Sequence, residues 1–295
     1  MKRIEFVKSM ALWPLVTCNM KLQDLPKITG TLPATDKMPV WFVGHGSPMN
    51  ALEDNAFTQS LRKMGAEVRE KYQPKAILVV SAHWLTRGSF VNVLPKPETI
   101  HDFGGFPQAL FEAQYPAPGA PDLARETAKL SSLIHETEEW GLDHGAWTIL
   151  MHLFPKADIP VFQMSIDYYQ PMEYHLQLAQ ELRALRERGV LVLGSGNIVH
   201  NLRMSISRLQ NNDTSPYDWA VEFDTWVHNQ IDKRDFLSLA KYEQAGNAAR
   251  LSVPTVDHYV PLLYTLGLAS EKEEIRQTYE EVTFGGISMR SFQVG

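Results

Sequence analysis

The chain has 295 residues, 44% hydrophobic and 21% charged, which is long and apolar enough to build the core of a single α/β domain. The formal net charge of −6, with no basic block or stripe, argues against nucleic-acid and anionic-membrane partners. The single cysteine, Cys18, excludes an intramolecular disulfide and a cysteine-based zinc site, and no apolar run reaches the roughly 18–20 residues of a membrane span.

Residues 1–38 are predicted to form an N-terminal extension to a domain that spans residues 39–295. Residues 1–20 combine a basic start with a short apolar stretch and faintly resemble an export signal. Pro14 interrupts that stretch, and no A-x-A cleavage site follows it. A cytoplasmic protein with an N-terminal arm is therefore the favoured interpretation, and export is the alternative.

Apolar, β-branched segments alternate with helical patterns along the rest of the chain. Strands are predicted at 39–43, 76–82, 90–94, 159–166, 190–195 and 287–294. Helices are predicted at 55–72, 121–133, 171–188, 219–231 and 257–266. Residues 96–119 are expected to form a long ordered loop of the kind that often binds ligands. The alternation predicts a single α/β domain with a central, mostly parallel or mixed sheet flanked by helices on both faces.

Four of the ten histidines fall where a predicted strand ends or a predicted helix begins. They are His45, His83, His200 and His258. Because the carboxyl ends of the strands form the ligand crevice of an open α/β sheet, three strands would deliver imidazoles to one edge. Imidazole is the commonest metal ligand and needs no cysteine partner. The pattern therefore predicts a metal site, although a structural role is the better interpretation for any one such histidine alone.

The remaining histidines carry a weaker signal. Those in helical patterns, interpreted as surface or packing residues, are His135, His152, His175 and His228. His101 and His144 lie in loops with unusual neighbours and are intermediate cases.

Other chemistries match the sequence less well. Ser47, in GHGSP, does not form a G-x-S-x-G elbow, although a serine hydrolase with a histidine base stays open. The GSGN segment at 194–197 lacks both the lysine of a P-loop and the third glycine of a dinucleotide fingerprint. A glycosidase-like pair of carboxylates is not evident.

The chain contains several long motifs, which are GHGSPMNALEDN (44–55), VVSAHW (79–84), IHDFGGFPQALF (100–111), YPAPG (115–119), LDHGAW (142–147), SGNIVHNLR (195–203) and DHYVPLLYTLG (257–267). Together and in this order they resemble the DOPA 4,5-dioxygenase branch of the class III extradiol (LigB-like) ring-cleavage dioxygenases. The resemblance runs from Pro39 to the C-terminus and leaves residues 1–38 uncovered.

This resemblance implies a non-haem metal site at which O2 opens a catechol ring beside its two hydroxyls. The implied metal ligands are His45, His83 and His258. His200 is implied as an acid/base or a fourth ligand, and His144 as a further active-site histidine. Fe(II) is the metal expected for the activity, and Zn(II) is the alternative occupant, since the third ligand position holds histidine where better-known relatives have glutamate. A zinc-binding non-oxygenase on the same fold, either a metal hydrolase or a binding module, is the alternative function.

A small aromatic catechol and O2 are the partners expected for this activity. The candidate substrate-binding residues beside the motifs are Ser47, Trp84, Asp102, Phe103, Asn197 and Tyr259. The aromatic side chains that could wall a slot for the ring, or simply pack in the core, are Trp84, Phe103, Phe106, Trp147 and Tyr259. The polar residues that could orient the site histidines, or make ordinary loop hydrogen bonds, are Asp102, Asp143, Asn197 and Asn201.

Overall fold

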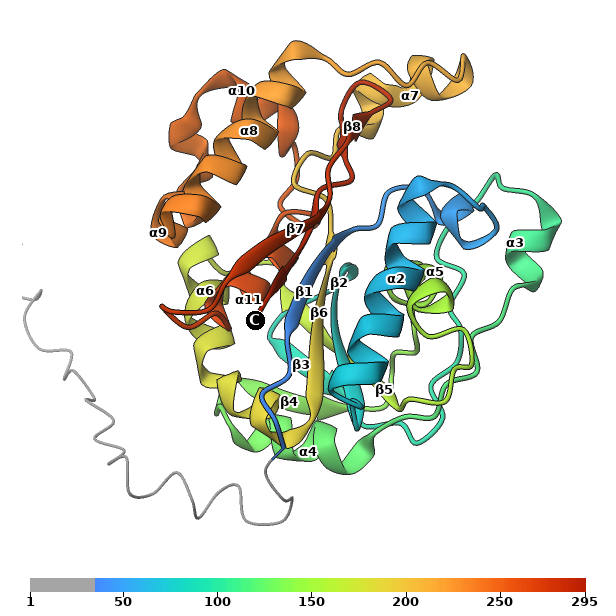
Figure 1. Ribbon diagram of the computed structural model, residues 1–295, viewed down its shortest axis with the longest axis vertical. Coiled ribbons are helices and arrows are strands. Elements are labelled where there is room, and N and C mark those ends of the chain that lie inside the picture. The colour runs from blue at the N-terminus through green and yellow to red at the C-terminus, as the bar shows by residue number, and fades with distance from the viewer. Residues whose placement is uncertain (1–34) are drawn as a thin grey trace, which may run out of the picture. The chain divides into compact units, whose positions relative to one another are not determined.

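The structure is a computed structural model of the chain and describes residues 35–295 (Figure 1). The segment that faintly resembles an export signal and most of the predicted extension therefore lie outside the described residues. Residues 35–38 are held to the domain by backbone hydrogen bonds. The Thr35 N–H donates to the Glu187 carbonyl at 2.8 Å, and the Met38 N–H donates to the Arg186 carbonyl at 2.9 Å. Between residues 35 and 295, no helix is both long and apolar enough to cross a membrane.

Eight strands form one mixed sheet in the order β4-β3-β5-β2-β6-β1-β10-β7. Their bounds are β1 Val40–Gly44, β2 Ala76–Thr86, β3 Ser89–Asn92, β4 Ile134–Thr137, β5 Val161–Asp167, β6 Val190–Gly196, β7 Ile275–Tyr279 and β10 Ser291–Val294. The four central strands, β5, β2, β6 and β1, are parallel, whereas β3, β10 and β7 join the sheet in antiparallel pairs. A small second sheet pairs β8, Val282–Thr283, with β9, Ile287–Ser288.

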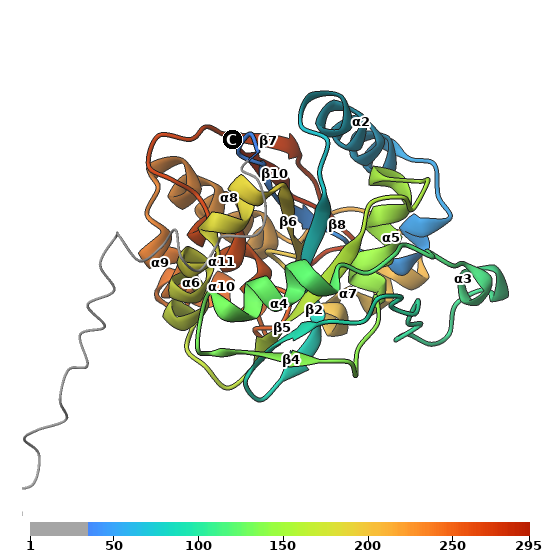
Figure 2. The same cartoon turned by 90° about the horizontal axis from the view of Figure 1, so that it is seen from below.

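Helices cover both faces of the large sheet (Figures 1 and 2). The α-helices are α2 Ala56–Lys71, α3 Gln108–Glu112, α4 Pro121–Lys129, α5 His144–Leu153, α6 Met172–Glu181, α7 Leu202–Gln210, α8 Asp218–Lys233, α9 Phe236–Ala240, α10 Asn247–Ser252 and α11 Val260–Gly267. The 3-10 helices are η1 Pro48–Ala51, η2 Arg183–Arg188 and η3 Tyr242–Ala245. Helices α2 and α5 pack on one face, and α6 and α11 pack on the other.

The side chains of strand β1 show why helices pack on both faces of the large sheet. Successive strand side chains point to opposite faces, so Val40 and Phe42 enter one hydrophobic core while Trp41 and Val43 enter the other. All four side chains are fully buried. The continuous apolar run at 39–43 is therefore the pattern of a strand enclosed on both sides, which confirms the predicted fold class.

Local capping decides where the predicted helices begin and end. Asn55 forms a capping box with Thr58, so α2 begins as predicted. The helix predicted at 171–188 instead ends at Glu181 and continues as η2, and Gly189 stops it with a φ of +82°. The helix predicted at 121–133 ends four residues early, at Lys129.

Two predicted segments divide or shift in the structure. The strand predicted at 287–294 is two strands, because β9 pairs with β8 whereas β10 pairs with β1 and β7. The helix predicted at 257–266 begins at Val260, which leaves His258 in the turn before α11. His135, placed in a helical pattern, lies exposed in strand β4.

His175 packs in the core as predicted and should make stability depend on pH. It is 1% exposed in α6, and its Nδ1 lies 3.2 Å from the Tyr264 hydroxyl. Burial, partly offset by Asp167, lowers the pKa of His175 to about 4. Below pH 6.5 the unfolded chain therefore binds a proton that the folded chain does not, and stability is lost as the pH falls.

A His175→Gln variant should lose less stability than the wild type on acidification, because Gln does not titrate. Between pH 7 and pH 4.5 the difference should be roughly 2 kcal/mol in the free energy of unfolding. Urea denaturation of both proteins at the two pH values measures it. Equal losses in the two proteins would contradict a buried neutral imidazole at this position.

Candidate metal centre

Three adjacent parallel strands bring their histidines to one edge of the sheet. Strand β6 pairs with β1 on one side and with β2 on the other. The His45 N–H, just past β1, donates to the carbonyl of Gly196 at the end of β6 at 3.0 Å. His83 lies inside β2 and not after it, because β2 runs on to Thr86 across an irregular stretch of its pairing with β5.

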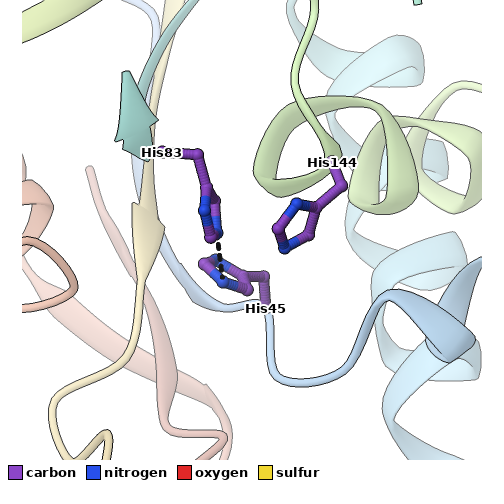
Figure 3. Close-up of side chains that lie close together, drawn as sticks. All are labelled: His45, His83 and His144. Atoms are coloured by element: carbon purple, nitrogen blue, oxygen red, sulfur yellow. Dashed lines mark hydrogen bonds between the residues drawn. The ribbon is translucent and has the colours of Figure 1, made fainter. Parts of the chain in front are cut away.

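His45, His83 and His144 form the first part of a histidine cluster, and their side chains point toward one another (Figure 3). The Nε2 atoms of His45 and His83 are 3.2 Å apart. The ring centroid of His144 lies 3.8 Å from that of His83 and 5.8 Å from that of His45. His144 was placed in a loop by its sequence, but it is the first residue of α5.

His258 and His200 complete the histidine cluster from the other side. Their rings stack with centroids 3.5 Å apart and planes 9° apart. The His258 centroid is 5.2 Å from that of His45 and 5.0 Å from that of His83. Together with the Asp257 carboxylate, His200 and His258 make a second group of side chains close enough to share one ion.

Hydrogen bonds fix the orientation of the His45 ring. Its Nδ1 lies 3.0 Å from the Ser195 hydroxyl, which itself donates to the Gly145 carbonyl at 2.5 Å. Because the hydroxyl has one proton, it must accept from His45 Nδ1–H, which leaves the lone pair of His45 on Nε2. That lone pair is on the atom that faces His83.

Carboxylates lie beside the Nδ1 atoms of three of the other four rings. The Asp257 carboxylate bonds Nδ1 of His258. One oxygen of Asp102 lies 2.9 Å from Nδ1 of His144 and 3.5 Å from Nδ1 of His83. An acceptor on one ring nitrogen that leaves the other free is the usual environment of a metal-bound histidine.

The cluster also has the charge state that a metal requires. Burial, reinforced by the neighbouring imidazoles, lowers the pKa values of His45 and His258 well below the ordinary range. Burial also lowers the pKa of His83, and it lowers that of His200 to about 4. All four rings are therefore neutral near pH 7, with lone pairs available to an ion.

The spacing of the nitrogens fits a metal as well. Two nitrogens bound tetrahedrally at 2.0–2.1 Å from one ion would lie about 3.3 Å apart, close to the His45–His83 separation. The donor set and its spacing thus fit a metal ion, and this is a metal-binding site.

The N-terminus of α5, which carries His144, is held by Asp143 together with Ser81 and Gln163, two residues to which the sequence analysis assigned no role. The Asp143 carboxylate caps the helix by accepting from the Ala146 N–H, and it also accepts from the Ser81 hydroxyl at 2.6 Å and the Gln163 amide at 2.7 Å. Burial raises the pKa of Asp143. Asp143 therefore positions the helix. The role predicted for it, as an acceptor that orients a site histidine, is not among its hydrogen bonds within residues 35–295.

Gly145 shows how closely α5 approaches the strands. A Cβ at this position would lie 2.5 Å from the Ser81 hydroxyl and 2.8 Å from Cδ2 of His83. Ser81 and Ser195, whose hydroxyls contact Asp143 and Gly145 at this docking site, have no assigned role in the sequence analysis.

Asp102 should matter for metal affinity, because it contacts two imidazoles and the start of α5. It also accepts a hydrogen bond from the His144 N–H at 2.9 Å. Burial alone would raise the pKa of Asp102, but the bonds and charge interaction with His144 lower it overall, so the carboxylate is ionised near pH 7. An Asp102→Asn variant should bind metal about 10–100-fold more weakly.

Competition with a chelator measures that affinity. Asp122→Asn is the matched control, since Asp122 is an exposed carboxylate at the start of α4. Equal affinity in wild type and Asp102→Asn would mean that Asp102 does not orient the histidines.

Two of the remaining predicted substrate-binding residues, Phe103 and Asn197, lie close to the histidine cluster. Phe103 meets the His144 ring edge-on with centroids 5.6 Å apart. Asn197 is buried and donates its amide to the Ser288 carbonyl at 2.8 Å, while its side-chain oxygen has no hydrogen-bond partner among residues 35–295.

The other candidates have structural contacts. Tyr259, expected to wall a slot, is fully buried against Tyr242 and donates to the Leu239 carbonyl, so it belongs to the core. Trp84 is buried and stacks on Trp140.

The last three residues considered cap helices or brace a loop. Ser47 and Asn201 cap η1 and α7. Trp147 donates its indole N–H to the Ile100 carbonyl.

Comparisons with known proteins show what this chain is similar to. Residues 39–290 match the family described as the catalytic LigB subunit of aromatic ring-opening dioxygenase. The chain is 42% identical to a 4,5-DOPA dioxygenase extradiol of Escherichia coli K12, covering 92% of this chain and 99% of that protein, and 34% identical to one of Beta vulgaris, covering 86% and 95%. A crystal structure of an uncharacterised Escherichia coli K12 protein, 39% identical, superposes with a TM-score of 0.74 over 88% of this chain and all of that one.

Proposed function

Because this chain belongs to the LigB family and is an extradiol ring-opening dioxygenase, we propose that it uses Fe(II) and O2 to open the ring of a small, DOPA-like catechol. The observation that supports this most strongly is the gathering of five histidines at the carboxyl ends of three parallel strands. In the proposed domain organisation, residues 39–295 form the dioxygenase domain and residues 1–38 an extension.

In this proposal the metal ligands are His45, His83 and His258. Each keeps its Nδ1 next to an oxygen, from Ser195, Asp102 and Asp257 respectively, and so can offer Nε2 to an ion. Fe(II) would supply open coordination positions and the redox chemistry that couples a catechol to O2.

His200 has the properties of the group that moves protons. It is half-buried, stacks on His258 and lines an open cavity, so one face of the cluster remains accessible through it. Because burial lowers its pKa to about 4, the ring is neutral near pH 7 and can accept a proton from a catechol hydroxyl. The same ring can then return the proton to the opening product.

His144, Phe103 and Asn197 are proposed to complete the substrate site. His144 is oriented by Asp102 and can support His200 by hydrogen bonding to substrate or oxygen. Phe103, edge-on to His144, would provide an apolar surface for the aromatic ring. The unpartnered oxygen of Asn197 can accept a hydrogen bond from a hydroxyl.

The donor set favours one alternative, a zinc-dependent protein without oxygenase activity. The three proposed ligands are all imidazoles, and the facial arrangement typical of Fe(II) oxygenases has two histidines and one carboxylate. A closed zinc site, or a zinc hydrolase that activates water, would also use such a set.

Turnover by the metal-loaded protein tests the proposal. The protein is purified without oxygen, loaded with either Fe(II) or Zn(II), and mixed with L-DOPA or caffeate. We expect O2 uptake together with a yellow ring-opened product in the Fe(II) sample and neither in the Zn(II) sample. Absence of turnover with every catechol, with iron shown to be bound, would overturn the proposal.

A further inference from the structure

A cavity of about 550 Å³ opens beside the histidine cluster. Its walls include His200 and Asp257 from the cluster, the apolar side chains of Leu202 and Met204, and the cationic side chains of Arg203 and Arg250. The volume suits a small aromatic ligand. The cavity therefore joins the proposed proton-transfer histidine to two arginines.

Two hydrogen bonds bring these arginines together from distant parts of the chain. Asn201 caps the start of α7, and its side-chain amide donates to the Leu251 carbonyl at 2.7 Å. The backbone N–H of His200 donates to the Ser252 carbonyl at 2.9 Å. These bonds join the start of α7, where Arg203 lies, to the end of α10, where Arg250 lies. Figure 1 shows α7 and α10 at the same end of the domain.

Both guanidinium groups are available to a ligand. Within residues 35–295, the guanidinium groups of Arg203 and Arg250 make no hydrogen bond or ion pair, whereas those of Arg186 and Arg290 are each engaged by carboxylates. The one carboxylate that lines the cavity, Asp257, bonds the Nδ1 of His258. The cavity thus has two unpaired cations and no unengaged anion.

We propose that Arg203 and Arg250 select catechols whose side chain ends in a carboxylate, which they bind while the catechol hydroxyls face His200. This inference rests on the proposed function and specifies its substrate class. Guanidinium groups are suited to carboxylates, which they bind through charge-assisted and often bidentate hydrogen bonds. An ammonium group on the same side chain gains nothing from this cavity, so the amino group of DOPA is not recognised.

Four catechols of similar size but different charge test the inference. They are 3-(3,4-dihydroxyphenyl)propionate, L-DOPA, dopamine and 4-ethylcatechol. For the wild type we expect the propionate to have the highest kcat/KM and dopamine the lowest, with L-DOPA between them. In Arg203→Gln and Arg250→Gln, the preference for the propionate over 4-ethylcatechol should fall roughly tenfold for each arginine, mainly through KM.

Binding measured without oxygen separates this inference from the proposed function. Calorimetry of the metal-loaded protein should give a dissociation constant for the propionate that rises roughly tenfold in each arginine variant, whether or not any catechol is turned over. Arg125→Gln, an exposed arginine of α4 outside the cavity, is the matched control and should bind as the wild type does.

The inference is overturned if the arginine variants weaken the propionate and 4-ethylcatechol equally, or if dopamine binds as well as the propionate. Lack of turnover with an intact carboxylate preference in binding would instead refute the proposed reaction alone.

Discussion

Replacing His45 with alanine should abolish metal binding and turnover together. His45 is 2% exposed, and its Nε2 lies 3.2 Å from that of His83. Alanine at this position would therefore leave a buried gap where the proposed ligand nitrogen lies. Altering residues that merely orient a metal ligand costs about 10–100-fold in affinity or activity, and removal of the ligand itself should cost more than about 100-fold. Metal analysis of the purified variant and O2 uptake with L-DOPA measure the two losses.

Two controls make the His45→Ala result specific. His135→Ala removes an exposed imidazole of β4 and should keep both metal and activity. The His45→Ala protein without metal should still unfold in a cooperative transition close to that of the metal-free wild type, because the change leaves both hydrophobic cores intact. Retention of a full metal equivalent by His45→Ala would refute its assignment as a ligand.

The sequence predicted the centre of this site better than its surroundings. His45 and His200 follow adjacent parallel strands, and any three such strands present their carboxyl ends at the same edge, so β-strand topology alone predicted that they converge. The contribution of α5 was less evident. LDHGAW has no long amphipathic pattern, because α5 is buried almost all round, so His144 was placed in a loop.

The supporting residues were harder to predict for a different reason. Ser81, Ser195 and Gln163 act through pairings with the start of α5, 20 to 62 residues away in sequence. A serine in a buried strand gives no local signal of such a partner. Periodicity also failed for β4 and β7, whose side chains are largely exposed or half-buried, because an alternating apolar pattern is weak in edge strands.

Tyr259 and Trp84 illustrate the limit of reasoning from sequence proximity. Each directly follows a cluster histidine, yet Tyr259 is directed into the core toward Tyr242, and Trp84 stacks on Trp140. Neighbours in a strand point to opposite faces, so a residue adjacent to His83 in β2 is directed away from it. The residues next to the metal site come instead from elsewhere in the chain, as Asp102 and Phe103 do.

Replacing His200 should separate an oxygenase from a closed zinc site, because the two functions need different things from this ring. A proton-transfer residue can be lost while the three ligands His45, His83 and His258 still hold the ion. His200→Ala should then keep its metal and lose about 10²–10⁴-fold in kcat. In a closed site with four imidazole ligands, the same change would release the metal.

His200→Phe controls for the stacking of His200 on His258, whose centroids lie 3.5 Å apart. Phenylalanine keeps a flat ring against His258 but can neither carry a proton nor bind an ion, so both variants should show the same loss of kcat if proton transfer is the role of His200. If His200→Phe retained wild-type kcat, His200 would be only a packing residue. If both variants lost metal in parallel with activity, His200 would be a fourth ligand and the zinc alternative would be favoured.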